Sequence, residues 1–133
     1  MANKKKNYKE NLSRVGDFGK DLTRRSKAKC ELCNAGKVHL TIFEVPPVPK
    51  EPTFDNCIFI CDHCLNIINN IDNLKENDLR FLEGACWSET PIVKATAIAM
   101  LKIYQEKYLW IEEFLDDLYI EEEIKELIEQ IKF

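Results

Sequence analysis

Two Cys-x-x-Cys pairs constrain the fold of this 133-residue chain more than any other feature. Cys30 and Cys33 form the first pair, Cys61 and Cys64 form the second, and 27 residues lie between them. Two thiolates three positions apart can occupy two corners of a tetrahedron when the backbone turns tightly between them. Two such turns complete a shell of four sulfurs, which suits Zn²⁺. The spacing therefore predicts one structural zinc ion per chain, bound by all four cysteines.

The remaining cysteines and the histidine of the second pair leave alternatives open. A redox-active pair of the thioredoxin type would lie next to a βαβ pattern, and neither pair does. His63 is an alternative ligand in place of one cysteine. Cys57 and Cys86 are interpreted as small buried hydrophobic residues. A disulfide between them is not expected in a reducing compartment.

The pattern around the cysteines predicts an α+β fold: a small zinc ribbon or treble-clef β-hairpin module followed by a helical C-terminal half. Segments 37–45 and 57–60 have the composition of two strands, and the prolines between them predict a loop. Thr90 and Pro91 suit the N-cap and the first position of the longest helix. Helices are predicted over 17–28, after Cys61, and over 77–82, 91–107, 109–119 and 120–132.

Three regions are predicted along the chain. Residues 1–12 are polar and charged and are expected to form a disordered basic leader. Residues 13–75 contain a helix and the zinc-binding hairpin module, and residues 76–133 form a helical region packed on it as one globular unit. No segment reaches the ~20 apolar residues of a membrane helix, and no apolar stretch follows the basic N-terminus. A cytoplasmic protein with no membrane partner is therefore expected.

Charge is divided unevenly along the chain, whose net charge is −4. Residues 1–29 carry ten basic residues against three acidic ones, whereas residues 110–133 carry nine acidic residues against two lysines. The basic end is interpreted either as a nucleic-acid footprint or as a set of solvated side chains. A sequence pI near 5.3 counts against the footprint. The candidate nucleic-acid contacts are Arg24, Arg25, Lys27 and Lys29.

Several motifs, taken in order, resemble one family of small bacterial proteins. They are Leu22-Thr23-Arg24-Arg25-Ser26, Phe43-Glu44-Val45-Pro46-Pro47, Cys61-Asp62-His63-Cys64-Leu65, Trp87-Ser88-Glu89-Thr90-Pro91 and Leu115-Asp116-Asp117-Leu118-Tyr119. Over residues 20–122 the chain resembles the PhnA-like (YjdM-like) proteins. The resemblance implies a zinc-binding N-terminal half, with Cys30, Cys33, Cys61 and Cys64 as ligands, and a helical C-terminal half. The alkylphosphonate label of that family comes from a gene cluster and describes no demonstrated reaction.

No catalytic residue can be assigned from the sequence. An HNH-type nuclease would share the treble-clef frame, but it needs a histidine at the end of the first strand, and His39 lies about five residues too early. A phosphonate hydrolase would need an open metal site or an activated nucleophile. Glu44, Glu89 and Asp62 are interpreted as surface or capping carboxylates instead.

The favoured function is therefore a zinc-stabilised module, not an enzyme, that binds a protein or a nucleic acid. The alternative is a degenerate relative of the HNH-type nucleases or an enzyme linked to phosphonate metabolism. Trp87 and Trp110 are expected to be core residues that join the zinc half to the helices. A second interpretation places Trp87, Ser88 and Glu89 along a ligand groove. The sequence predicts no particular oligomeric state.

Overall fold

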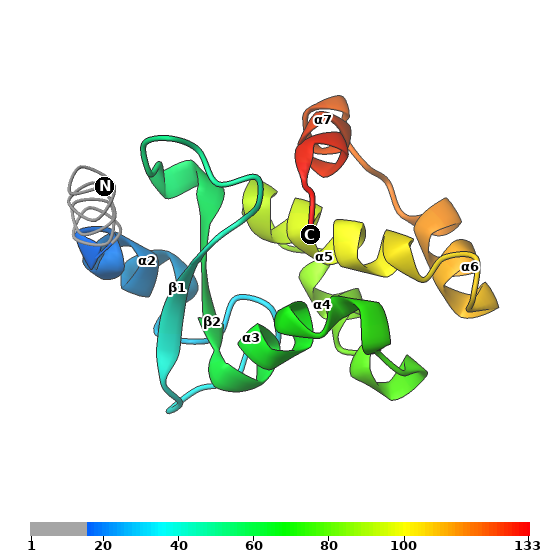
Figure 1. Cartoon of the computed structure of the whole chain (residues 1–133), viewed down its shortest axis with the longest axis horizontal. Helices are drawn as coiled ribbons and strands as arrows, with labels where there is room; N and C mark the ends of the chain where they lie inside the picture. Colours follow the sequence, from blue (N-terminus) through cyan, green and yellow to red (C-terminus); the bar gives the residue numbers. More distant parts are fainter. Residues whose placement is uncertain (1–15) are drawn as a thin grey trace, which may run out of the picture.

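An antiparallel β-hairpin lies at the centre of the N-terminal half of the computed structural model, which describes residues 16–133 (Figure 1). Strand β1 (Leu40–Glu44) pairs along its whole length with strand β2 (Cys57–Cys61). β-branched and aromatic residues fill most positions, as expected of a half-buried sheet. The strand predicted over 37–45 begins later, because Lys37 has a φ of 57°, outside the β region. The hairpin itself is confirmed.

A proline-rich loop joins the two strands, as predicted. The backbone N–H of Val45 donates to the carbonyl of Asn56 at 3.0 Å, and the Asn56 side-chain amide donates to the carbonyl of Val45 at 2.9 Å. A 3₁₀ turn, η1 (Phe54–Asn56), leads into β2. The peptide bond between Pro46 and Pro47 is cis. These hydrogen bonds close the base of the loop and keep the ends of the strands together.

Helix α2 (Gly19–Ser26) is fixed to the hairpin by a buried ion pair. The guanidinium of Arg25 donates hydrogen bonds of 2.9 and 2.8 Å to the carboxylate of Glu31 and one of 2.8 Å to the carbonyl of Cys57. Glu31 also accepts the backbone N–H of Phe59 at 2.9 Å. Only 17% of the Arg25 side chain and 5% of the Glu31 side chain are exposed. The pair therefore connects the helix, the first cysteine pair and β2.

Helices make up most of the chain after β2, so the predicted α+β architecture is confirmed. They are α3 (Asp62–Asn69), α4 (Leu82–Ala85), α5 (Pro91–Ile103), α6 (Leu109–Asp117) and α7 (Glu122–Gln130), with the 3₁₀ turns η2 (Ile71–Asn73) and η3 (Glu76–Asp78) between α3 and α4. Helix α5 lies in the middle of this half and contacts both α4 and α7 (Figure 1).

Helix α5 takes the central place because it is apolar on nearly all sides. Every residue from Ile92 to Leu101 is buried, which is typical of a helix in a protein core. Pro91 occupies the first helical position, as predicted. The hydroxyl of Thr90 makes no capping hydrogen bond, however, and the backbone N–H of Thr90 donates to the Ser88 hydroxyl at 3.1 Å. The predicted start of the helix is thus confirmed. The proline at its first position favours this start, and the Thr90 hydroxyl does not contribute a cap.

The helix predicted over 77–82 is wrong, because the chain forms the single turn η3 and then the short helix α4. The carboxylate of Asp78 accepts the backbone N–H of Lys75 at 2.9 Å, a local bond that caps one turn. Just before this turn, the backbone N–H of Leu74 donates to the hydroxyl of Tyr104 at 2.8 Å. A partner thirty residues away therefore helps to shape this segment, and local periodicity does not reveal it.

One cluster of buried side chains extends from the cysteine pairs to the last helix. It includes Ile58 and Ile60 of β2, Ile98 of α5 and Ile128 of α7. The hairpin and the helices therefore share one apolar core within the described residues. The leader predicted over residues 1–12 lies outside those residues. No helix in the described part of the chain is long and apolar enough to cross a bilayer.

We expect Arg25→Ala to lower the free energy of unfolding by about 3–5 kcal/mol, because it leaves the buried Glu31 carboxylate without its partner. Arg24→Ala is the matched control. The Arg24 side chain is 81% exposed and lies 3.8 Å from Asp21, so its loss should change stability by less than about 1 kcal/mol. Urea unfolding followed by circular dichroism measures both values. Equal losses in the two variants would contradict the role given to the buried pair.

Candidate metal centre

The side chains of Cys30, Cys33, Cys61 and Cys64 converge on one point. Their Sγ atoms all lie within 4.8 Å of one another. The Sγ atoms of Cys30 and Cys64 are 3.6 Å apart, and so are those of Cys33 and Cys61. A zinc ion ~2.3 Å from four sulfurs at tetrahedral corners would set those sulfurs ~3.8 Å apart. The four cysteines can therefore hold one metal ion, and residues 16–133 contain no other such group.

Local backbone structure aims the sulfurs at one another. In the first pair, the N–H of Asn34 donates to the carbonyl of Cys30 at 2.8 Å, and the N–H of Cys33 approaches Cys30 Sγ at 3.5 Å. Asn34 has a left-handed φ of 65°, which asparagine adopts more readily than most residues. In the second pair, Cys61 is the N-cap of α3 and Cys64 lies in its first turn. The start of α3 therefore sets the spacing and direction of the second pair of sulfurs.

The sulfurs affect one another's ionisation. The hydrogen bond between Cys30 and Cys64 lowers the pKa of Cys30 to about 4 and is the largest effect that raises the pKa of Cys64. Burial raises the pKa of Cys33 to about 11. The cluster therefore forms one thiolate readily and resists further negative charge. A divalent cation supplies the charge that allows all four sulfurs to ionise, because metal binding displaces thiol protons.

The two other cysteines are buried and do not belong to the cluster. Cys57 and Cys86 have no exposed surface, as their interpretation as small hydrophobic residues requires. Burial is the main cause that raises the pKa of Cys57 to about 11 and that of Cys86 to about 12. Both thiols are therefore protonated at neutral pH and unreactive. His63, the alternative ligand, is exposed, and its ring lies 6.3 Å from that of Phe81, outside the sulfur group.

Glu44, interpreted from the sequence as a surface or capping carboxylate, is partly buried. Its Oε1 atom has no hydrogen-bond partner within residues 16–133, and burial raises the pKa of this carboxyl. Glu44 lies opposite Cys57 in the hairpin, and its negative charge adds to the effects that raise the pKa of that thiol. This corner of the hairpin thus disfavours negative charge on Glu44 and Cys57.

The four candidate nucleic-acid contacts do not share one environment. Arg24, Lys27 and Lys29 are exposed. Arg25 faces inward, where its guanidinium is bonded to Glu31 and to the hairpin backbone. The structure therefore corrects Arg25 from a surface contact to a structural residue. Its partner lies inside the first cysteine pair, and helical periodicity alone does not indicate such a bond.

Trp87 corrects a second expectation, because 65% of this residue is exposed and it does not join the two halves in the core. Glu89 is also exposed, and Ser88 is partly buried. Grooves lie at the end of α2, beside the proline-rich loop and near the C-terminus. None of these three grooves is lined by Trp87, Ser88 or Glu89. Trp110 is partly buried beneath Arg80, whose guanidinium carbon lies 4.0 Å from the ring centroid.

The fold places two residues beside the exposed lysines that the sequence did not indicate. Lys37, which follows the first cysteine pair, and Phe59 of β2 line the same groove as Lys27 and Lys29. Phe59 thus brings an aromatic residue of the hairpin beside the lysines of the basic segment. No local signal points to Phe59, because it is a typical strand residue.

Comparison with known proteins identifies no relative of this chain. No family model, no curated protein and no solved structure matches it. The resemblance to the PhnA-like proteins therefore stays a prediction.

We expect removal of a bound metal ion by a chelator to unfold the hairpin while α5 and α7 stay folded. A two-stranded hairpin is marginal in water, and the free energy of binding a structural metal is folding free energy. Helices α5 and α7 keep their contacts with each other. Hydrogen exchange should show lost protection at Ile42 and Phe59 and retained protection at Ile98.

Mild acid should produce the same state as the chelator, because protons compete with the metal ion for the thiolates. Unchanged exchange in β1 and β2 would contradict this expectation.

Proposed function

We propose that the protein is an interaction module stabilised by one structural Zn²⁺ ion and that it catalyses no reaction. The observation that carries this proposal is the meeting of four sulfur atoms within 4.8 Å of one another beside the hairpin. A tetrahedral set of four thiolates is typical of zinc or of iron. Zinc is the favoured ion, because sites with four cysteine ligands in small domains are typically structural zinc sites.

The donor set supports a structural ion. Four thiolates fill a tetrahedral shell and leave no position for water or substrate. Cys30, Cys61 and Cys64 are buried, so an ion held by them is shielded from solvent. Such an ion would connect the turn after α2 to the start of α3, and it would hold the two strands that lie between those points.

The surroundings of His39 favour a non-catalytic module over a nuclease. Strand β1 ends at Glu44, where a nuclease of the HNH type would have a histidine. His39 precedes the strand, and its Nδ1 lies 3.2 Å from a carboxylate oxygen of Asp62. The side chains of both residues are more than two-thirds exposed, at 75% and 71%. An exposed pair of this kind does not build the shielded metal site that phosphodiester cleavage requires.

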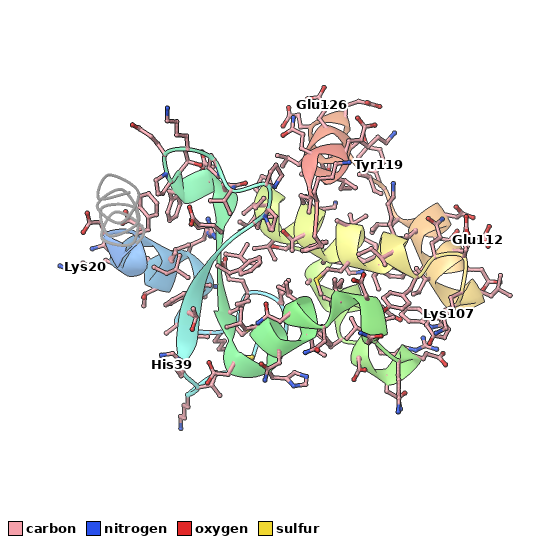
Figure 2. All side chains as sticks on the ribbon, viewed as in Figure 1. Lys20, His39, Lys107, Glu112, Tyr119 and Glu126 are labelled. Carbon is pink, nitrogen blue, oxygen red and sulfur yellow. The ribbon has the colours of Figure 1, made fainter. Side chains whose placement is uncertain are left out.

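The distribution of charge supports a role in binding. Lys20 and His39 lie at the end formed by α2 and β1, Glu112 of α6 lies at the opposite end near Lys107, and Glu126 of α7 lies between the two ends (Figure 2). Residues 110–133 carry nine acidic residues against two lysines, and an uneven distribution of charge of this kind orients an approaching charged partner. Membership of the PhnA-like proteins is part of the proposal and is supported by the order of the sequence motifs alone.

We expect native mass spectrometry to show one zinc ion per chain, and X-ray fluorescence to identify it. Cys33→Ala should abolish stoichiometric binding, because the loss of one ligand opens the shell. Cys86→Ala removes a thiol outside the cluster and should keep the ion. Undiminished metal content in Cys33→Ala would refute the ligand set. Visible absorption from iron would refute the identity of the ion.

We expect no cleavage of supercoiled plasmid by the zinc-loaded protein in Mg²⁺ or Mn²⁺, because neither histidine is part of a shielded metal site. Gel electrophoresis after prolonged incubation provides the measurement, and His39→Ala is the matched control. Reproducible nicking by the wild-type chain that disappears in His39→Ala would show that the protein is an enzyme.

A further inference from the structure

A groove of ≈ 620 Å³ lies between the end of α2 and the turn after the first cysteine pair. Lys29 and Gly36 form an isolated β-bridge, which holds two of the segments around it side by side. A third segment comes from the hairpin. The residues that line the groove are Thr23, Lys27, Ala28, Lys29, Gly36, Lys37, Val38, Leu40 and Phe59.

The groove is positively charged. Lys27, Lys29 and Lys37 are exposed, and none of them forms an ion pair with any residue of the described range 16–133. No carboxylate lines the groove. Three acidic side chains on neighbouring segments are already paired: Asp21 with Arg24, Glu31 with Arg25 and Asp62 with His39. The lysine charges are therefore available to an anionic partner.

Apolar side chains line the same groove as these lysines. Phe59 of β2 and Leu40 of β1 are partly exposed, and 44% of Val38 is exposed. An aromatic ring beside a row of cations is the arrangement that binds single-stranded nucleic acids, since a base stacks on the ring while the phosphates meet the cations.

The backbone holds two of the three lysines in a left-handed conformation. Lys27 and Lys37 have a φ of 57°, and Ala28 has a φ of 60°. Side chains disfavour this left-handed region. The N–H of Ala28 donates to the carbonyl of Thr23 at 2.9 Å, which holds the turn. Lys27 is the left-handed C-cap of α2, and three of the four left-handed residues in the described range line this groove, so its backbone follows a defined path.

We infer that this groove binds single-stranded nucleic acid, with Lys27, Lys29 and Lys37 on its phosphates and one base on Phe59. The inference rests on the proposed function, because it names the partner of the interaction module. A double helix fits the groove less well, since its base faces are hidden within the stack and leave the apolar surface without a contact. An acidic protein segment would satisfy the lysines, but only a nucleic acid carries a flat ring on every charged unit of its backbone.

The test uses the full zinc-loaded chain, a short fluorescent oligo-dT strand, and fluorescence polarisation over a range of salt concentrations. Lys29→Gln/Lys37→Gln should weaken binding and reduce the slope of log Kd against log salt by about 1.4, because each single-strand phosphate contact contributes about 0.7. Lys50→Gln/Lys102→Gln removes the same charge from exposed positions outside the groove. This control should leave the slope unchanged.

The aromatic contact is tested separately. Phe59→Leu keeps an apolar strand residue and should weaken binding at least about fivefold, the loss expected when one stacked base loses its ring. Phe59→Tyr keeps the ring and should bind as the wild-type chain does. Unchanged affinity in Phe59→Leu would overturn the role of the apolar surface.

Two further results would overturn the inference. Equal effects of the groove pair and the control pair would show that net charge alone explains binding. Equal affinity for a duplex or for poly-glutamate would identify a double helix or an acidic protein as the partner. Zinc content is measured on every sample. A wild-type chain that holds zinc but does not bind the strand refutes this inference alone, whereas a chain without zinc refutes the proposed function.

Discussion

The meeting of four sulfur atoms beside the hairpin is the constraint on which the rest of the structure depends. It joins the turn after α2 to the start of α3, and both short strands lie between these points. The Arg25–Glu31 pair reinforces the same junction with hydrogen bonds to β2. Glu31 lies between Cys30 and Cys33. The same four-residue turn therefore provides two sulfur ligands and the carboxylate that binds both Arg25 of α2 and the backbone of β2. Few residues thus determine how the hairpin half is assembled.

The helical half continues from this junction rather than standing apart from it. Strand β2 contacts α5, and α5 in turn contacts α4 and α7. A helix buried along ten consecutive residues has little surface free for solvent, so it needs neighbours on every side. The hairpin supplies one of those neighbours. The apolar core is therefore continuous from Cys30 to Ile128, although the two halves differ in secondary structure.

The sequence was sufficient to predict features that arise from local spacing. The cysteine pairs, the two strands, the proline-rich loop and the helix that begins at Pro91 each depend on residues a few positions apart. Features that depend on distant partners were missed. Arg25 finds Glu31 and the Cys57 carbonyl inside the fold, and Tyr104 shapes the segment where a helix was expected. The exposure of Trp87 was not predicted either, because nothing in the neighbouring sequence indicates which side of the chain this large apolar residue faces.

The candidate groove extends this contrast between local and distant contacts. Lys27 and Lys29 were identifiable as part of a basic segment, but Lys37 and Phe59 join them only because the chain folds back after the first cysteine pair. The β-bridge between Lys29 and Gly36 pairs the residues on either side of the first cysteine pair. It closes the turn that contains Cys30 and Cys33. The segment that contains the first two metal ligands is therefore flanked by Lys29 and Lys37 of the groove. Under the proposed function, an ion that orders the turn would also order the groove, and a metal without a part in chemistry would then control the binding of a partner.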